Sequence, residues 1–273
     1  MSGTLHVVSV PIGNADDITL RALRVLRTAH LVAAEDTRST SALLAHHGLS
    51  VRLVALHDHN EREQVDHLVS RLQRGELIAL VSEAGTPLVN DPGFRLVRAC
   101  IDAGIDIDVV PGACAAVAAL TGAGLPVDRW LYAGFFPRET GARARLADEL
   151  GGLRATLIFY ESPQRLGATL EWLATAWPTR EVCVARNLTK QHEQWLRGPA
   201  TEVRAALGDE DRGEVVILVA PPTEAPLVQD ADAFARDLLA RGLDPRAARD
   251  ALAEATGLSR RDAYRKVLDL LGR

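Results

Sequence analysis

Five short strand-like runs in the first 110 positions constrain this chain more than any other feature. The runs lie at 5–10, 31–34, 51–56, 77–82 and 106–110, and a segment with helical spacing of its apolar residues follows each one. As a group they lack the alternation of apolar and polar residues that marks a half-exposed strand. Strands that are apolar on both faces are typical of a parallel sheet covered by helices on both sides. The pattern predicts an α/β fold with a mainly parallel N-terminal sheet.

Glycine and proline residues divide the rest of the chain. Gly124, Pro126, Gly134 and Pro137 cluster after the last of these helices and predict a domain junction near Pro126. We expect an N-terminal α/β domain at 1–125, a C-terminal α/β domain at 126–222 and a helical tail at 231–273. The second domain is expected to have strands at 130–135, 156–160, 182–187 and 215–220, with helices at 142–150 and 164–174.

The tail resembles a helix-turn-helix, with predicted helices at 246–255 and 260–271. Ser259 stands where it can cap the second of these helices, with Asp262 at the third position of a capping box. From Arg236 onward the tail has nine cations and six anions, an excess of three positive charges. This excess favours a role for the tail in docking RNA, although such helices also pack against partner subunits.

Charge and cysteine content exclude several classes of protein. The net charge of −5 argues against a surface that coats nucleic acid throughout, although a local basic face remains open. The only lysines are Lys190 and Lys266, and neither follows a glycine, so a Walker A loop is excluded. The three cysteines are widely spaced, which argues against a disulfide framework and against a zinc ribbon. With no apolar stretch of 18 residues, we expect a cytoplasmic protein that does not contact a membrane.

Ligands of parallel sheets bind where loops leave the carboxyl ends of the strands, and here those loops are polar. The loop from Glu83 to Pro87 contains Gly85, which allows a ligand to approach the backbone closely; a tight turn is the alternative. The small residues of 111–116 either admit a ligand to a helix N-terminus or let the helix pack closely. The charged segment from Glu35 to Arg38 suits substrate binding or an ion-pair lock.

The segment His57-Asp58-His59-Asn60-Glu61 has two histidines that share one side of an extended chain. No third set of ligands accompanies them, so we expect a polar substrate loop and no metal site. In the second domain, Glu161 and Lys190 end two strands and are the best acid or base candidates, although either can be structural. Trp195 is most simply a packing residue, with stacking on a nucleobase as the alternative.

Taken in order, these motifs closely resemble one known family, the ribosomal RNA small subunit methyltransferase I family. It belongs to the tetrapyrrole-methylase-like class of S-adenosylmethionine enzymes. The resemblance covers nearly the whole chain. It rests on the ordered segments PIGN at 11–14, DIT at 17–19, AEDTR at 34–38, LHDHNE at 56–61, VSEAGTP at 81–87, NDPG at 90–93, PG at 111–112, FYESP at 159–163 and LTK at 188–190.

The resemblance implies a two-domain, usually dimeric α/β enzyme with its cofactor in the cleft between domains. It implies 2′-O-methylation of a cytidine, cytidine 1402, in 16S rRNA near the ribosomal P site, with the 30S subunit as the expected setting. The family usually has Asp at position 83, Pro at 113 and Glu at 187, where this chain has Glu83, Ala113 and Asn187. The last difference removes a carboxylate from that site.

Three sets of site residues follow from the loops and the resemblance together. The expected catalytic residues are Glu161, Lys190, Glu35 and Arg38. The expected S-adenosylmethionine contacts are Pro11, Gly13, Glu83, Ala84, Gly85, Thr86, Pro87, Cys114, Ala115, Tyr160 and Leu188. The expected substrate contacts are Asp36, His57, His59, Asn60 and Arg165.

Two other functions remain open at this point. One is a methylase of a small tetrapyrrole, and the other is a non-catalytic RNA-binding factor for ribosome assembly. The arginine-rich tail favours RNA over a tetrapyrrole. The intact loops favour catalysis over binding alone.

Overall fold

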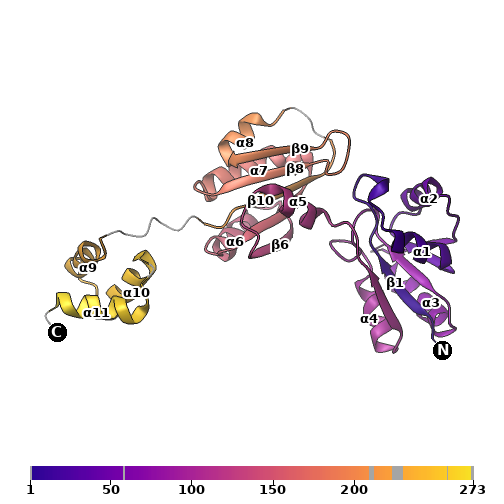
Figure 1. Ribbon diagram of the computed structural model, residues 1–273, viewed down its shortest axis with the longest axis horizontal. Helices are drawn as coiled ribbons and strands as arrows, with labels where there is room; N and C mark the ends of the chain where they lie inside the picture. The colour runs from indigo at the N-terminus through magenta and orange to yellow at the C-terminus, as the bar shows by residue number, and fades with distance from the viewer. Residues whose placement is uncertain (1, 58, 209–211, 223–229, 257, 272–273) are drawn as a thin grey trace. The chain divides into compact units, whose positions relative to one another are not determined.

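The structure, a computed structural model, describes residues 2–57, 59–208, 212–222, 230–256 and 258–271 (Figure 1). The chain forms two compact units, residues 1–221 and residues 222–273. Each unit is described by itself. The first contains two five-stranded sheets, and the second is helical. The expected division of the first unit near Pro126 stays a prediction.

The first sheet is entirely parallel, with strand order β3-β2-β4-β1-β5. Its strands are β1 (Thr4–Val8), β2 (Leu31–Ala34), β3 (Leu53–Ala55), β4 (Ile78–Val81) and β5 (Asp106–Val110). Every residue of β2 and β4 is buried, because helices cover both faces of these central strands. The prediction of a mainly parallel N-terminal sheet is confirmed.

Helices cover the two faces of this sheet in pairs. After the short 3-10 helix η1 (Ala15–Asp17) they are α1 (Leu20–Thr28), α2 (Thr37–His46), α3 (Glu61–Gln73) and α4 (Phe94–Asp102). Leu68 of α3 and Leu96 of α4 pack against one face of the sheet. Leu26 of α1 and Leu44 of α2 pack against the other face. All five strands therefore send their carboxyl ends, and the polar loops that follow, to one edge of the sheet.

The second sheet has the order β6-β7-β10-β8-β9, and only β6 and β7 are parallel. Its strands are β6 (Trp130–Phe135), β7 (Thr156–Glu161), β8 (Glu181–Arg186), β9 (Gln194–Pro199) and β10 (Val215–Val219). The associated helices are α6 (Thr140–Leu150), α7 (Pro163–Ala176) and α8 (Ala200–Ala206). Leu170 of α7 and Val203 of α8 pack in the core on one face of this sheet.

The helix α5 (Ala115–Ala123) covers the other face of the second sheet, although it follows the last strand of the first. Ala119 and Leu120 pack with Ile158 of β7 and Leu218 of β10. Its small side chains allow the helix to lie close to the strands. A single helix therefore connects the strand ends of the first sheet to the face of the second.

The sequence patterns predict no element over residues 194–206, where the structure has β9 and α8. The strand β9 lies at the edge of the second sheet and contains Gly198 and Pro199, which are unfavourable in a central strand. Its antiparallel pairing with all six residues of β8 provides the backbone hydrogen bonds. Pairing with β8, rather than strand propensity, therefore explains this element.

The second unit is a cluster of three helices, α9 (Ala231–Ala240), α10 (Pro245–Thr256) and α11 (Arg260–Leu270). Leu238, Leu252 and Val267 form its buried core. The Ser259 hydroxyl oxygen accepts a hydrogen bond from the Asp262 backbone N–H at 3.1 Å, which confirms the predicted cap of α11. Within the described residues, no helix is both long enough and apolar enough to cross a membrane.

Candidate functional site

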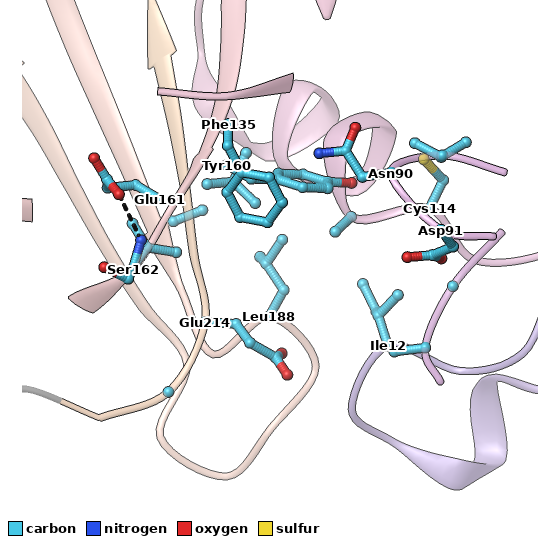
Figure 2. Close-up of a pocket in the computed structure, with 18 of the residues that line it drawn as sticks. Ile12, Asn90, Asp91, Cys114, Phe135, Tyr160, Glu161, Ser162, Leu188 and Glu214 are labelled. Atoms are coloured by element: carbon cyan, nitrogen blue, oxygen red, sulfur yellow. Dashed lines mark hydrogen bonds between the residues drawn. The ribbon is translucent and has the colours of Figure 1, made fainter. Parts of the chain in front are cut away.

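A cavity of about 570 Å³ lies between the loops of the first sheet and the face of the second sheet (Figure 2). Its walls come from the loops after β1, β2 and β4, from the start of α5, and from β6, β7, β8, β10 and their loops. The lining residues are Ile12, Glu35, Ala84, Gly85, Thr86, Val89, Asn90, Asp91, Cys114, Ala115, Phe135, Tyr160, Glu161, Ser162, Pro163, Gln164, Ala185, Leu188, Gly213, Glu214, Val215 and Val216.

The loop after β4 forms one wall of the cavity, and its backbone is fixed by two neighbouring loops. Gly85 forms an isolated antiparallel bridge with Val10, and their two backbone hydrogen bonds measure 2.8 and 3.1 Å. Gly85 has φ of +77°, and a Cβ there would lie 3.2 Å from the Ile12 side chain. The Thr86 hydroxyl donates to the Ala113 carbonyl at 2.9 Å. The loops after β1, β4 and β5 therefore form one backbone-lined surface.

Tyr160 connects the start of α5 to the second sheet. Its hydroxyl oxygen accepts a hydrogen bond from the Ala116 backbone N–H at 3.2 Å. Burial raises the pKa of Tyr160 to about 12, so the phenol is neutral at physiological pH. Its ring lies edge-on to Tyr132, with 4.9 Å between ring centroids. Tyr160 is therefore a rigid, neutral wall of the cavity.

The loop after β8 presents Leu188 to the cavity in a strained backbone. Asn187 and Thr189, on either side of Leu188, have positive φ angles of +51° and +63°. The Glu193 carboxylate accepts hydrogen bonds from the Thr189 N–H at 2.7 Å and from the Trp195 indole N–H at 2.8 Å. These two bonds hold the pKa of Glu193 below its usual value. Glu193 thus secures the loop that carries Leu188.

This loop also contacts the loop after β1. The Asn14 N–H donates to the Thr189 hydroxyl at 3.0 Å. A Cβ on Gly13 would lie 2.7 Å from the Leu188 carbonyl oxygen, from the Thr189 hydroxyl and from Lys190 Cγ. Only glycine fits here without displacing a neighbour. Beside this contact, Lys190 Nζ forms an ion pair with Glu214 at 2.9 Å, and Glu214 lines the cavity.

The predicted catalytic residues have different environments. The Glu161 side chain is fully buried, and one oxygen accepts from the Ser162 N–H at 2.8 Å (Figure 2). The other oxygen accepts from the Thr169 hydroxyl at 2.6 Å. It also pairs with Arg165 at 3.2 Å. Glu35 lines the cavity and accepts from the Glu83 N–H at 3.1 Å. The Arg38 side chain is 93% exposed, and its guanidinium forms a long ion pair of 3.5 Å with the Asp36 carboxylate.

Most of the predicted substrate contacts have structural partners. Asp36 caps α2 by accepting from the Arg38 and Ser39 backbone N–H groups, and these bonds lower its pKa. The Asn60 carboxamide accepts from His57 N–H and donates to the Ala55 carbonyl.

His57 and His59 lie with ring centroids 6.0 Å apart, while Asp58, which stands between them, is outside the described residues. Arg165 donates to the backbone carbonyls of Phe136 and Pro137. Considering only the part of the chain that the structure describes, no group of three or more His, Cys, Asp or Glu can hold a metal ion.

The cavity brings together nine of the predicted site residues: Glu35, Ala84, Gly85, Thr86, Cys114, Ala115, Tyr160, Glu161 and Leu188. A second cavity of about 170 Å³, near the start of α2, is lined by Pro11, Gly13 and Glu83. Eight predicted residues line neither of these two cavities: Pro87, Lys190, Arg38, Asp36, His57, His59, Asn60 and Arg165.

Sequence reasoning did not place Phe135, Asn90 or Glu214 among the site residues, although all three line the cavity. The sequence could have identified Asn90 as a site residue, because it follows the polar loop after β4. The sequence pattern could not identify Phe135, because it stands in an apolar strand where a core position is expected. The Trp195 ring packs closely on Gly122 of α5. A Cβ added to Gly122 would lie only 2.4 Å from the ring. The packing interpretation of Trp195 is therefore the one that the structure supports.

The chemistry of the cavity suits a cofactor with a cationic centre and a flat apolar group. Ile12, Leu188 and Val216 supply apolar surface, and the Glu35, Asp91 and Glu214 side chains carry carboxylates. The volume falls in the range of ~300 to 1,000 Å³ that is usual for small-molecule sites. Gly85 and Ala115 bring backbone to the surface with little side chain to obstruct a ligand.

Comparison with known proteins places the fold in a class. Residues 4–204 match the family described as tetrapyrrole (corrin/porphyrin) methylases. Among solved structures, a diphthine synthase superposes with a TM-score of 0.62 at 15% identity, covering 80% of this chain and 90% of that one. The uroporphyrin-III-C-methyltransferase of Thermus thermophilus superposes with a TM-score of 0.56 at 23% identity, covering 80% and 94%. The chain has the tetrapyrrole methylase fold.

Curated relatives narrow this class. A protein of Micromonospora olivasterospora is 45% identical over 97% of this chain and 87% of its own length. Another, from Pseudomonas aeruginosa, is 43% identical over 100% of this chain and 99% of its own length. Both bear the name ribosomal RNA small subunit methyltransferase I. The chain belongs to the ribosomal RNA small subunit methyltransferase I family, as the sequence motifs predict.

Proposed function

We propose that this chain transfers a methyl group from S-adenosylmethionine to the ribose 2′-oxygen of a cytidine in 16S rRNA, cytidine 1402. The observation that carries the proposal is the cavity between the two sheets, lined by residues from the family's motifs. The names of the 43–45% identical relatives support small subunit rRNA as the substrate. These names do not support the two alternatives, a tetrapyrrole substrate and a non-catalytic RNA-binding role in ribosome assembly.

When bound, S-adenosylmethionine supplies an activated methyl on a sulfonium. In the transfer, the bond from sulfur to the methyl carbon breaks as the bond from O2′ to that carbon forms. The hydroxyl proton leaves to a base, and S-adenosylhomocysteine is released. The in-line geometry requires the ribose oxygen about 3 Å from the methyl carbon. The Gly85 loop, Ala115 and Leu188 would hold the cofactor, and Tyr160 would exclude water from one side.

We propose that Glu35 takes the hydroxyl proton and that Lys190 stabilises the oxygen that loses it. One oxygen of Glu35 accepts the Glu83 N–H, and the carboxylate lines the cavity. Lys190 does not line the cavity itself, but it is half exposed and paired with Glu214, which does, and from there its cation can stabilise a developing alkoxide. Glu161 has three partners and is buried, so we assign it the positioning of Arg165 and the strand ends. The exposed Arg38 suits a contact with an RNA phosphate.

We propose further that the enzyme acts in the cytoplasm on the 30S subunit and works as a homodimer. The relatives' names support a substrate within the small ribosomal subunit. Dimerisation rests on the family resemblance alone. We also propose that the helical tail binds RNA, and its excess of positive charge supports this role.

The test uses the whole chain with S-adenosylmethionine carrying an isotopically heavy methyl group. The protein is incubated separately with 16S rRNA and with 30S subunits that lack this modification. Digestion to nucleosides and mass spectrometry should find the added mass on the ribose of cytidine, with an unmodified base. Mass on the base, or no transfer to either RNA, would contradict the proposal. The variants E35Q and K190A should reduce turnover far more than they reduce cofactor affinity.

A further inference from the structure

Phe135 occupies an unusual position at the cavity between the two sheets. Its side chain is a large apolar group, yet it is 60% exposed. The ring lines the cavity and lies edge-on to Tyr160, with 5.9 Å between ring centroids (Figure 2). An exposed aromatic ring is unremarkable elsewhere on a surface, but at the rim of a ligand cavity it offers a free face to a ligand.

An irregularity in β6 places the ring there. In the regular part of the strand, Leu131 and Ala133 face the core beneath the sheet, whereas Tyr132 faces α5. Strict alternation would send Phe135 to the same face as Leu131 and Ala133. The pairing with β7 instead shifts register, so that Tyr132 lies opposite Ile158 but Phe135 lies opposite Tyr160. One extra residue in β6 thus turns Phe135 from the core to the cavity.

Gly134 allows this change of register. It has φ of +74°, a conformation that L side chains rarely adopt. Bulges of this kind occur next to binding sites, where they change the direction of a side chain. The following residue, Phe136, returns to the core and is 1% exposed. The bulge therefore has a definite result, which is that one of two adjacent phenylalanines faces the cavity.

Asn90 lines the same cavity as Phe135 and carries an available carboxamide. It approaches the Gly134 backbone, since a Cβ on Gly134 would lie 3.8 Å from the Asn90 amide oxygen. Across the ranges that the structure describes, the Asn90 carboxamide forms no hydrogen bond with another residue. Its backbone has φ of +69°, and Leu88 two residues earlier has φ of +71°. The turn after β4 is strained while it presents the Asn90 side chain to the cavity.

A flat ring and a carboxamide that line one cavity match the chemistry of a nucleobase. Proteins that recognise unpaired RNA bases stack them on aromatic side chains and form hydrogen bonds with their pairing edges. The pairing edge of cytosine has an amino donor next to a ring-nitrogen acceptor. A carboxamide supplies the complementary acceptor and donor. A cytidine whose 2′-oxygen enters this cavity brings its base to the rim, where such a surface can hold it.

We propose that Phe135 and Asn90 bind the base of the target cytidine, with the ring stacking on the base and the carboxamide bonding its pairing edge. The inference rests on the proposed function and adds to it a subsite for the nucleobase. Phe135 and Asn90 are then substrate-binding residues. They set the affinity for RNA and leave the affinity for the cofactor unchanged.

The test compares F135L, which keeps apolar volume but removes the aromatic face, with F135Y, which keeps the face. N90G removes the carboxamide, and glycine adopts φ of +69° without strain. F94L is the matched control, because Phe94 is 70% exposed on α4 and does not line the cavity. Measurements are KM and kcat with 30S subunits that lack the methyl group, the Kd of S-adenosylhomocysteine, and Tm.

We expect F135L to raise the KM for 30S subunits by about tenfold, since base stacking typically contributes that much or more. N90G should raise it by about fivefold, which corresponds to one neutral hydrogen bond. F135Y and F94L should resemble the wild type, and the Kd of S-adenosylhomocysteine and Tm should be unchanged throughout.

Two results would overturn the proposal. Wild-type KM in both F135L and N90G would show that these side chains do not touch the RNA. A parallel rise in the Kd of S-adenosylhomocysteine would mean that the ring stacks on the adenine of the cofactor. The wild-type protein tests the proposed function separately, because its failure to methylate 30S subunits would refute that function whatever the variants do.

Discussion

The two walls of the cavity are stabilised in different ways. The wall from the first sheet consists of loops whose backbones bond to one another, as in the bridge between Gly85 and Val10. Beside this wall, Asp36 caps α2 and the Asn60 carboxamide stabilises its own turn. The wall from the second sheet consists mainly of side chains, including Phe135, Tyr160 and Leu188. Its loops depend on a bulge, on two strained residues and on the carboxylate of Glu193, which lies four residues beyond Thr189 in the same loop.

This difference separates stability from ligand binding. Changes at the caps of the first wall should lower the stability of the fold and leave the shape of the cavity intact. Changes at the contacts that position the second wall should alter ligand affinity at a smaller cost in stability. Three variants test this contrast, in order of decreasing expected effect.

The variant E61A should have the largest effect, and the effect should be on stability. The buried Glu61 carboxylate accepts from the Gly93 N–H at 3.1 Å and from the Arg95 N–H at 3.0 Å, at the start of α4. Removing it leaves these donors without a partner at a cost of about 2 kcal/mol. Urea unfolding measures this loss, with E63A on the exposed side of the same helix as control. A large change in the Kd of S-adenosylhomocysteine would contradict the claim that the first wall affects stability and not ligand binding.

The variant G13A should act on affinity. A Cβ at this position would lie 2.7 Å from the Leu188 carbonyl oxygen, so the loop that carries Leu188 must move. We expect the Kd of S-adenosylhomocysteine to rise by about tenfold, because overpacking of this size typically costs 1 to 3 kcal/mol. The control is G152A, where a Cβ meets nothing within 4 Å. Equal Kd values for the two variants would show that the contact between the walls has no role in binding.

The variant E193Q should have the smallest effect and a characteristic pH dependence. The Thr189 N–H and the Trp195 indole N–H bond to different oxygens of the carboxylate, and glutamine replaces one of these oxygens with an NH₂ group that cannot accept. We expect a loss of about 1 kcal/mol at pH 7. Because the pKa of Glu193 is lowered in the folded protein, its stabilising effect is present above the usual value of 4.5 and is lost as the pH falls through the lowered pKa.

Unfolding curves at several pH values test this prediction. The difference in stability between wild type and E193Q should be constant near neutral pH and should shrink below pH 4.5. The variant E171Q, which changes a carboxylate paired with Arg204, is the control. A difference that does not depend on pH would show that the charge of Glu193 contributes nothing to holding the loop.

Much of the first wall could be predicted from the sequence, because its signals are local. The runs at 31–34 and 77–82 predict buried parallel strands, and a parallel sheet sends its polar loops to one edge. The loops and the family resemblance together predict Gly85, Thr86 and Cys114 at the site, and the structure brings them to one cavity. The motifs also predict the family, and the relatives confirm it.

The second wall depends on contacts between residues far apart in the chain, which no local pattern carries. The tertiary structure decided that α5 packs on the second sheet, that a bulge turns Phe135 to the cavity, and that Glu161 is buried among three partners. It also decided that the edge strand β9 forms at all, since that strand depends on pairing with β8. The sequence by itself determined the parallel sheet, the polar loops at its strand ends and the cap of α11, because hydrophobic periodicity and capping act over a few residues. Packing and strand register act between distant segments, and only the folded chain sets them.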